Sequence, residues 1–364
     1  MTAEPYALIS LDAIRQNVEK VREYAPNVKI MAVIKANGYG HGLLLMAQAL
    51  NNVDGLAVAR ISEAVFLRKS GVTNKLLILG GFVSERELNK IVEYRLDVVI
   101  HSVQQVKILK KHLGETKISI WLKLNTGMNR LGLSPNEFSL AYQQLIALSH
   151  INPSILLMTH LSSADDMKSS VTQQQIAFFN KIVNKNNISG EKSIANSAGI
   201  IGWPGSVTNW VRPGLMLYGV SPFLNSSGED LGLNPVMSLH SKIIAVKNIA
   251  AGESVGYSGA WVSKKLTRLG VVGIGYGDGY PRHAKNGTPV LVNNKRVPLV
   301  GRVSMDMITV DLSSQRNVKL GDIVTLWGNG LPVEEIAKYA DTIPYTLLCG
   351  ITQRVEIKKC IASE

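Results

Sequence analysis

Cysteine is scarce in this chain of 364 residues: there are two, Cys349 and Cys360, without the short spacing of a CxxC motif. A disulfide framework or a cysteine-based zinc site is therefore not expected. Long hydrophobic runs are missing as well, since no stretch approaches the roughly 18 apolar residues of a membrane helix. The first residues lack the basic and then apolar segments of a signal peptide. We therefore expect a cytoplasmic protein with no membrane partner and no metal.

Aromatic residues make up only 6% of the chain, although its formal net charge is +12. The lysines and arginines are scattered in small groups such as Lys107, Lys110 and Lys111. Aromatic residues do not alternate with these groups, as they would on a surface that stacks bases. Nucleic acid is therefore not an expected partner. The positive charge favours small anions instead, such as a phosphate or an amino-acid carboxylate.

Short apolar runs alternate with segments of helical periodicity between residues 30 and 220, which is typical of βα units around a parallel sheet. The eight runs cover residues 30–34, 55–59, 76–79, 97–100, 118–124, 155–159, 193–196 and, as the weakest, 209–219. Eight such units predict a (β/α)8 barrel. Serines close to acidic residues predict helix starts at Ser62, Ser84 and Ser134.

The pattern changes after about residue 235, where strand-like runs are separated by glycine, proline and asparagine turns. One short helix is expected near the end, at residues 333–340. The predicted class is thus α/β, with an N-terminal (β/α)8 barrel followed by a mostly antiparallel β domain. We place the barrel at residues 12–230 and the β domain at 231–364. The segment 1–11 contains a strand that we expect to join the β domain.

Polar residues follow several of the predicted barrel strands, at the end where active sites of this fold lie. They are Lys35, Arg130, His160, Asn196 with Ser197, and Arg212 with Gly214. The last two loops are those that commonly bind phosphate in this fold. A lysine desolvated beside other cations has a lowered pKa and can attack an aldehyde. A phosphate-bearing aldehyde would suit Lys35 and the loops together, whereas the alternative is a lysine that extends into solvent.

Nine motifs resemble those of alanine racemases and occur in the order of that family. They are AVIKANGYGHG (32–42), LKLNTGMNRLG (122–132), THLSSADD (159–166), ANSAG (195–199), VRPGLMLYG (211–219), VGYSGAW (255–261), VGIGYGDGYPR (272–282), GRVSMDM (301–307) and IPY (343–345). An ordered set of this kind is far more specific than any single motif. The resemblance implies a cytoplasmic, homodimeric isomerase that depends on pyridoxal 5'-phosphate. It would interconvert L- and D-alanine and supply D-alanine for the peptidoglycan of the cell wall.

The resemblance also implies which residues hold the cofactor. Lys35 would bind it covalently, and the other contacts would come from Tyr39, His160, Asn196, Ser197, Arg212, Gly214, Leu215 and Tyr345. Arg212 would face the pyridine nitrogen. Because a guanidinium does not give up its proton, the ring would stay neutral and transamination would be suppressed. His160 would fix Arg212, and the alternative is an ordinary core histidine.

Racemisation removes a proton from one face of Cα and delivers one to the other. By resemblance, Lys35 serves one face and Tyr257, from the partner subunit, serves the other, so each site is shared. An unperturbed tyrosine titrates near 10, so Tyr257 needs neighbours that favour its anion.

Substrate contacts follow from the same resemblance. Arg130 and the backbone N–H of Met305, also from the partner subunit, would bind the substrate carboxylate. Lys123 matches a position that carries a carbamate in some members. Asn125 stands where many relatives have Asp, so an ordinary barrel lysine remains the alternative. The access corridor would be lined by Asp165, Tyr276, Arg282, Arg302 and Asp306, which otherwise look like surface turn residues.

Other functions remain as alternatives. A broad-specificity or serine racemase differs only in a pocket whose width the sequence does not give, and alanine is the expected substrate. A non-catalytic protein that binds pyridoxal phosphate would need neither a β domain nor Tyr257. A basic amino-acid decarboxylase would carry a different C-terminal motif with a catalytic cysteine, whereas Cys349 lies in a segment that resembles racemases.

Overall fold

The computed structural model describes residues 4–360, so the outermost residues of the predicted 1–11 and 231–364 segments, 1–3 and 361–364, lie outside the described residues. The chain divides into two compact units. The barrel unit comprises residues 18–38 and 43–217. The β unit comprises the residues up to 17, residues 39–42 and the residues from 218 onward. Among the described residues, no helix is both long and apolar enough to cross a membrane.

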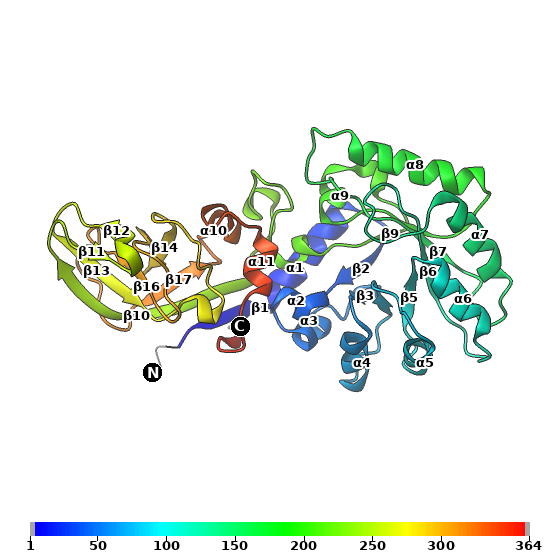
Figure 1. Cartoon of the computed structure of the whole chain (residues 1–364), viewed down its shortest axis with the longest axis horizontal. Coiled ribbons are helices and arrows are strands. Elements are labelled where there is room, and N and C mark those ends of the chain that lie inside the picture. Colours follow the sequence, from blue (N-terminus) through cyan, green and yellow to red (C-terminus); the bar gives the residue numbers. More distant parts are fainter. Residues whose placement is uncertain (1–3, 361–364) are drawn as a thin grey trace. The chain divides into compact units, whose positions relative to one another are not determined.

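Eight parallel strands in the described part of the barrel unit form a closed barrel in chain order (Figure 1). They are β2 (Lys29–Val33), β3 (Gly55–Val58), β4 (Leu76–Ile78), β5 (Asp97–Ile100), β6 (Ile120–Lys123), β7 (Leu156–Met158), β8 (Lys192–Ser193) and β9 (Trp210–Val211). The barrel closes where β9 pairs with β2. Each of the eight predicted runs overlaps one strand, so the predicted (β/α)8 barrel is confirmed.

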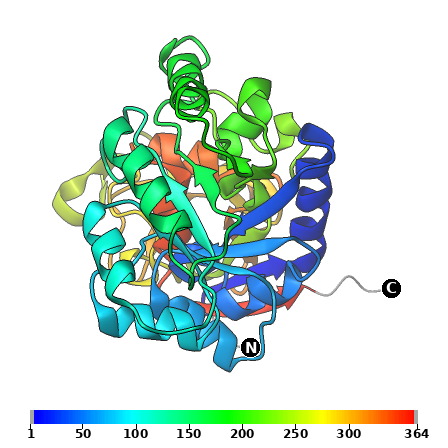
Figure 2. The same cartoon turned by 90° about the vertical axis from the view of Figure 1, so that its right-hand side faces the viewer.

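Helices surround the barrel strands, as Figure 2 shows. In chain order the helices up to residue 202 are α1 (Leu11–Tyr24), α2 (Lys35–Tyr39), α3 (Leu43–Ala49), α4 (Ile61–Lys69), α5 (Glu85–Glu93), α6 (Val103–Lys111), α7 (Pro135–Ile146), α8 (Val171–Lys185) and α9 (Ser197–Gly202). Ser84 and Ser134 are N-cap residues, as predicted. The helix start predicted at Ser62 is wrong. α4 already begins at Ile61, because the Glu63 carboxylate accepts the backbone N–H of Arg60 at 2.9 Å and caps the first turn.

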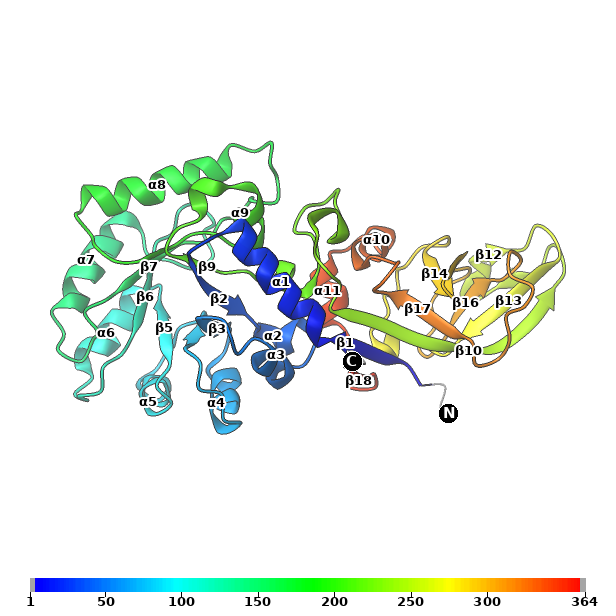
Figure 3. The same cartoon turned by 180° about the vertical axis from the view of Figure 1, so that it is seen from behind.

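A sheet of mostly antiparallel pairs forms the described β unit (Figure 3). Its eight strands are β1 (Tyr6–Ser10), β10 (Met237–Ile249), β13 (Thr267–Val272), β14 (Pro289–Val292), β15 (Lys295–Pro298), β16 (Ile308–Asp311), β17 (Ile323–Trp327) and β18 (Glu356–Cys360). β1 lies between β10, to which it is antiparallel, and β18, to which it is parallel. A separate hairpin consists of β11 (Ser254–Val255) and β12 (Trp261–Val262). The predicted mostly antiparallel β fold is confirmed.

Two helices lie near the end of the β unit. The predicted one is α10 (Val333–Tyr339), and the sequence reading missed the second, α11 (Pro344–Cys349). Its signal is Pro344 at the first helical position, where a proline fits well. Short 3-10 turns complete the described elements: η1 (Pro204–Ser206), η2 (Leu215–Tyr218), η3 (Glu229–Leu231), η4 (Tyr257–Gly259) and η5 (Tyr276–Asp278).

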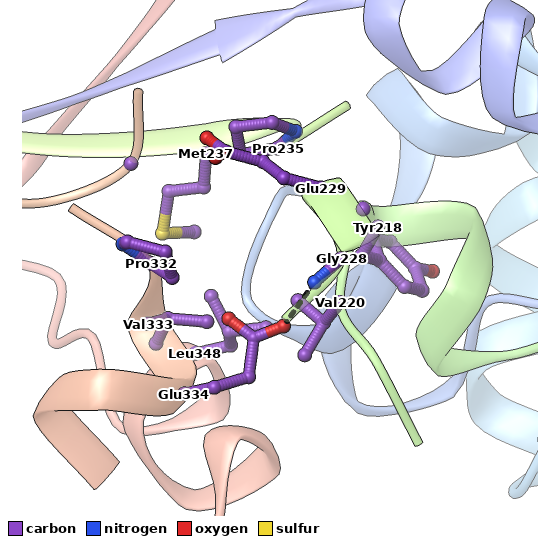
Figure 4. A pocket seen from close by; sticks show the side chains of 12 residues that line it. Tyr218, Val220, Gly228, Glu229, Pro235, Met237, Pro332, Val333, Glu334 and Leu348 are labelled. Carbon is purple, nitrogen blue, oxygen red and sulfur yellow. Dashed lines mark hydrogen bonds between the residues drawn. The ribbon is translucent and has the colours of Figure 1, made fainter. Parts of the chain in front are cut away.

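A small cavity in the β unit lies beside the buried carboxylate of Glu334 (Figure 4). Its volume of about 20 Å³ holds roughly one water molecule, so it is too small for a substrate. Oε1 of Glu334 accepts the backbone N–H groups of Ser221, at 2.9 Å, and Gly228, at 2.8 Å. These bonds hold the segment that follows Tyr218. Burial raises the pKa of Glu334 above its ordinary 4.5.

We predict that the stability of the Glu334→Gln variant, relative to that of the native chain, increases as the pH rises. A raised folded-state pKa means that the stability contributed by Glu334 is present below about pH 4.5 and is lost as the pH rises through the folded-state pKa. The amide oxygen of glutamine still accepts both N–H groups. Thermal unfolding at a series of pH values checks this, with Glu335→Gln as the control. If the Tm of the variant minus that of the native chain stayed constant or fell as the pH rose, the prediction would be contradicted.

Candidate active site

The carboxyl ends of the barrel strands bring together the candidate residues of the barrel unit. Lys35 follows β2, and Arg212 follows β9 directly. His160 lies two residues beyond β7, and Ser197 begins the helix after β8. Arg130 lies in the loop after β6. Lys35, Arg130 and Arg212 each lower the pKa values of the same two residues, Lys123 and His160.

The backbone directly after Lys35 makes a left-handed turn. Four consecutive residues have φ between 52° and 62°: Ala36, Asn37, Gly38 and Tyr39. This conformation costs roughly 1–2 kcal/mol for each residue with a side chain. Two hydrogen bonds within the barrel unit offset part of that cost. The Asn37 side chain accepts the N–H of Leu43 at 2.8 Å, and Glu63 accepts the N–H of Ala36 at 2.9 Å. Strain of this kind is characteristic of functional sites.

Arg212 is buried, and four hydrogen bonds fix its guanidinium. Nη1 donates to Ser193 Oγ at 2.6 Å, and Nη2 donates to the carbonyl of Thr159 at 2.6 Å. Nη2 also reaches the carbonyl of Ile194 at 3.3 Å and Nδ1 of His160 at 3.5 Å. None of these bonds uses Nε. Burial lowers the pKa of Arg212 to about 10, so the side chain remains a cation at neutral pH.

Several positive charges converge at this end of the barrel. The pKa of Lys123 is lowered to about 8, first by burial and then by Arg212, Arg130 and Lys35. Burial and the same cations, together with Lys123, hold the pKa of His160 well below its usual range. His160 is therefore neutral at pH 7 and can accept a hydrogen bond from Arg212. A desolvated group of cations is stabilised by a bound anion, so the barrel mouth is suited to an anionic ligand.

The loops after β8 and β9 are joined through Ser197. Its Oγ accepts the backbone N–H of Gly214 at 2.9 Å and that of Met216 at 3.3 Å. Asn196 caps α9 by accepting the N–H of Gly199 at 2.9 Å. Among the described residues, the N–H of Leu215 has no hydrogen-bond acceptor. The arrangement places a hydroxyl and backbone N–H groups on the two loops that form phosphate sites in this fold.

Tyr39 and Tyr345 lie together in the β unit. Their ring centroids are 5.8 Å apart, and Tyr39 also stacks on Tyr218 at 4.6 Å. Burial and the neighbouring Tyr345 and Cys349 raise the pKa of Tyr39, so its phenol keeps its proton. Gly40 allows the close packing of this segment on α11, because a Cβ there would come within 2.0 Å of the Leu348 carbonyl. Tyr345 is exposed and Tyr39 is buried.

The candidates for the second base and for the substrate loop lie in exposed turns of the β unit. Tyr257 begins η4 and is 63% exposed, and Met305 is 53% exposed. Tyr276 lies in η5, with the Arg282 guanidinium 5.8 Å from its ring. Three corridor candidates are exposed as well: Arg282, Arg302 and Asp306. The remaining one, Asp165, is an exposed residue of the barrel unit.

Sequence reasoning missed some residues that shape the site. Ser193 and the Thr159 carbonyl hold Arg212, and Tyr218 stacks on Tyr39. Ser193 and Thr159 lie at the ends of predicted strands, so the strand-end rule could have found them. The Arg354 side chain contacts two turns of the β unit that carry candidate residues, and no motif that we singled out contains it.

The chain combines a (β/α)8 barrel with an antiparallel β unit. The barrel carries a lysine after a strand, a buried arginine and two loops of the kind that bind phosphate. These features are typical of barrel proteins that bind an anionic ligand beside an amine. Residues 9–222 match the family model of the alanine racemase N-terminal domain, and residues 236–359 match that of the C-terminal domain. The chain belongs to the alanine racemase family.

Relatives and solved structures agree with this membership. The chain is 47% identical over 353 residues to an alanine racemase of Shewanella sediminis, a match that covers 97% of this chain and 98% of the relative. It is 46% identical over 351 residues to that of Vibrio cholerae, with 96% and 97% coverage.

The fold is similar to the biosynthetic alanine racemase of Pseudomonas aeruginosa, with a TM-score of 0.94, 38% identity and coverage of 98% and 99%. A Bartonella henselae alanine racemase with covalently bound pyridoxal phosphate matches with a TM-score of 0.88 and 27% identity, covering 99% of this chain and all of that one (100%).

We predict that Lys123 titrates near pH 8 in cofactor-free protein, because burial and three neighbouring cations lower its pKa to about 8. NMR of lysine-labelled protein in CO₂-free buffer would follow its side-chain signals, which Lys123→Met identifies by their loss. The control is Lys107→Met, a change at an exposed position of α6, which should leave those signals in place. If every lysine titrated at the value of exposed ones, the convergence of charge on Lys123 would be wrong.

Proposed function

We propose that this chain is a pyridoxal-phosphate-dependent alanine racemase that interconverts L- and D-alanine by a two-base mechanism. One observation carries the proposal. An amine on a strand end, Lys35, lies in a group of cations that includes the buried Arg212, at the end of a barrel that matches the alanine racemase family. Such a site suits a cofactor that carries both an aldehyde and a phosphate.

The residues present fit that cofactor. Lys35 would hold it covalently through Nζ. The phosphate would be held by Ser197 and the backbone N–H groups of Gly214 and Leu215, with Asn196 shaping the loop. Tyr39 and Tyr345 would add phenol donors. The raised pKa of Tyr39 supports this role, because a protonated phenol donates to a phosphate oxygen and a phenolate does not.

Arg212 would face the pyridine nitrogen of the cofactor, and His160 would help to fix it. Its Nη atoms are engaged with the barrel, which leaves the Nε–H for the ring nitrogen. Even with its pKa lowered to about 10, Arg212 keeps its proton at neutral pH and does not protonate the ring. When bound, the cofactor withdraws electrons from the Cα–H bond of the amino acid. A neutral ring does so weakly, which favours racemisation over transamination.

Two proton-holding groups are needed because one base does not reach both faces of Cα. Lys35 Nζ would take or give the proton on one face, and the Tyr257 hydroxyl would do so on the other. Tyr257 is largely exposed in the single chain. We propose that it acts in the site of a second subunit of a homodimer. Met305 and Met307, exposed apolar residues of the same unit, support a protein contact here.

Substrate binding would use Arg130 and the backbone N–H of Met305. A guanidinium presents a planar pair of donors to a carboxylate, and Met305 adds a neutral donor from the partner subunit. The corridor to the site would be lined by Asp165, Tyr276, Arg282, Arg302 and Asp306, whose charges admit a small zwitterion. The cytoplasmic location, the supply of D-alanine to peptidoglycan and the domain boundaries given above remain predictions. A carbamate on Lys123 remains open.

We predict that Lys35→Ala abolishes racemisation, because both the covalent attachment and one proton-holding group are lost. Purified holoprotein would be incubated with L-alanine and the D-alanine formed measured by chiral chromatography. Lys107→Ala, on the exposed face of α6, is the control and should retain activity. Turnover of more than about a tenth of the native rate in Lys35→Ala would end the assignment of Lys35.

A second prediction separates the two bases. Tyr257→Phe removes only the hydroxyl, so the cofactor should still bind while the rate of D-alanine formation falls by about a hundredfold or more. Incubation of each alanine enantiomer in deuterated water, followed by mass spectrometry, measures proton exchange at Cα. Exchange should be lost for L-alanine, the enantiomer that we assign to Tyr257. Unchanged exchange of L-alanine would point to another base.

A further inference from the structure

Arg354 joins two carboxylates of the β unit that are distant in sequence. Its Nε lies 3.2 Å from Oδ1 of Asp278, and its Nη2 lies 2.7 Å from Oδ1 of Asp306. Asp278 is only 2% exposed, whereas Asp306 lies on the surface. Oδ2 of Asp278 also accepts the backbone N–H of Gly275 at 2.9 Å. The guanidinium thus connects the turn that contains η5 with the turn that carries Asp306.

Backbone bonds join the same segments, which we call the Arg354 junction: residues 275–279, 304–307 and 352–354. The N–H of Gly277 donates to the carbonyl of Met305 at 2.8 Å, and that of Tyr276 donates to the carbonyl of Ser304 at 3.0 Å. Thr352 Oγ1 donates to the carbonyl of Gly277 at 3.0 Å. The junction therefore brings all three segments into direct contact.

Glycine is needed at position 275 for this approach, and at position 277 it leaves room for Arg354. A Cβ on Gly275 would lie 2.3 Å from the Met305 carbonyl oxygen, and a Cβ on Gly277 would lie 2.4 Å from Nη1 of Arg354. The contact at Gly275 is with backbone and excludes a side chain there, whereas the contact at Gly277 is with the end of the Arg354 side chain, which a Cβ would displace. The 304–307 turn and Arg354 are thus both packed closely on residues 275–277.

The junction engages the carbonyl of Met305 and leaves the N–H of Met305 open. The carbonyl of Met305 accepts a hydrogen bond from Gly277, while its N–H has no acceptor among the described residues. Met305 and the neighbouring Asp306 are exposed. The direction of the open N–H is thus set by the contacts that Arg354 and η5 make with this turn.

We propose that Arg354 is a positioning residue for substrate binding: it fixes the 304–307 turn through Asp278 and Asp306, so that the Met305 N–H is aimed at the substrate carboxylate. This inference rests on the proposed function, because it assigns that N–H to an amino-acid substrate. A planar guanidinium contacts two carboxylates at once, whereas a lysine ammonium is a single point charge. Arg354→Lys is therefore expected to keep only part of the effect.

The kinetic test compares Arg354→Met and Arg354→Lys with the native holoenzyme. Loss of one well-aimed hydrogen bond should raise the KM for L-alanine about tenfold and leave kcat within about threefold. The inhibition constant of propionate, which is alanine without its amino group, should rise by the same factor. The KM and the inhibition constant of Arg354→Lys should lie between those of the native enzyme and those of Arg354→Met.

The matched control is Arg296→Met, which removes another Arg–carboxylate pair of the β unit, with Glu335. It should leave KM unchanged. A fall in kcat with KM and the propionate constant unchanged would overturn the proposal.

Two further measurements separate this inference from the proposed function. Hydrogen exchange at the amides of Tyr276 and Gly277, which donate to the carbonyls of residues 304 and 305, should be at least about tenfold faster in Arg354→Met, with the rest of the β unit unchanged. This result does not depend on racemisation, so an inactive native protein would end the proposed function, while the exchange rates would still test the junction. Unchanged exchange at Tyr276 and Gly277, or faster exchange throughout the unit, would overturn the inference.

The pair acts as one unit, so Asp306→Asn and Arg354→Met together should raise KM no more than the larger single effect. Fully additive effects would show that Arg354 does not act through Asp306. If Arg354→Met does not fold, Arg354→Lys carries the same kinetic and exchange tests. If Arg354→Lys then had the KM and the hydrogen-exchange rates of the native enzyme, the proposal would be overturned.

Discussion

The concentration of positive charge at one end of the barrel is the constraint on which the rest of the site depends. Arg212 is buried, and its hydrogen bonds to Ser193 and Thr159 hold it there as a cation. Burial, together with the charges of Arg212, Arg130 and Lys35, lowers the pKa of Lys123 to about 8 and keeps His160 neutral. A bound anion best compensates the positive charge at this end of the barrel, and the phosphate of the cofactor that we propose would provide it.

The backbone after β2 carries two candidate residues that belong to different units, Lys35 and Tyr39. The left-handed turn of residues 36–39 follows Lys35 directly. Lys35 therefore remains with the barrel unit, while Tyr39, four residues later, packs on Tyr218 in the β unit. Side-chain hydrogen bonds from Asn37 and Glu63 stabilise the turn. The strain of the turn is thus partly offset by hydrogen bonds that form only in the folded barrel.

The architecture was predictable from the sequence because it follows from periodicity. Alternating apolar runs indicated the barrel, and the strand-end rule then placed Lys35 and Arg212 at the same end. The left-handed turn was not predictable, because Ala36 has no intrinsic preference for positive φ. The start of α4 was placed wrongly because Glu63, rather than Ser62, caps it. In the Arg354 junction, Arg354 contacts Asp278 and Asp306, which lie 76 and 48 residues before it, and no local pattern reports such contacts. Roles shared between subunits depend on a second chain and therefore rest on the family resemblance.

The most direct test of the central claim is to locate the cofactor on the chain. Native protein would be reduced with borohydride, which makes the bond between an amine and the pyridoxal aldehyde permanent, and its peptides would be mapped by mass spectrometry. Our account predicts one modified residue, Lys35, with Lys123 unmodified. Modification spread over several surface lysines, or a Lys35 peptide without added mass after incubation with pyridoxal phosphate, would contradict it.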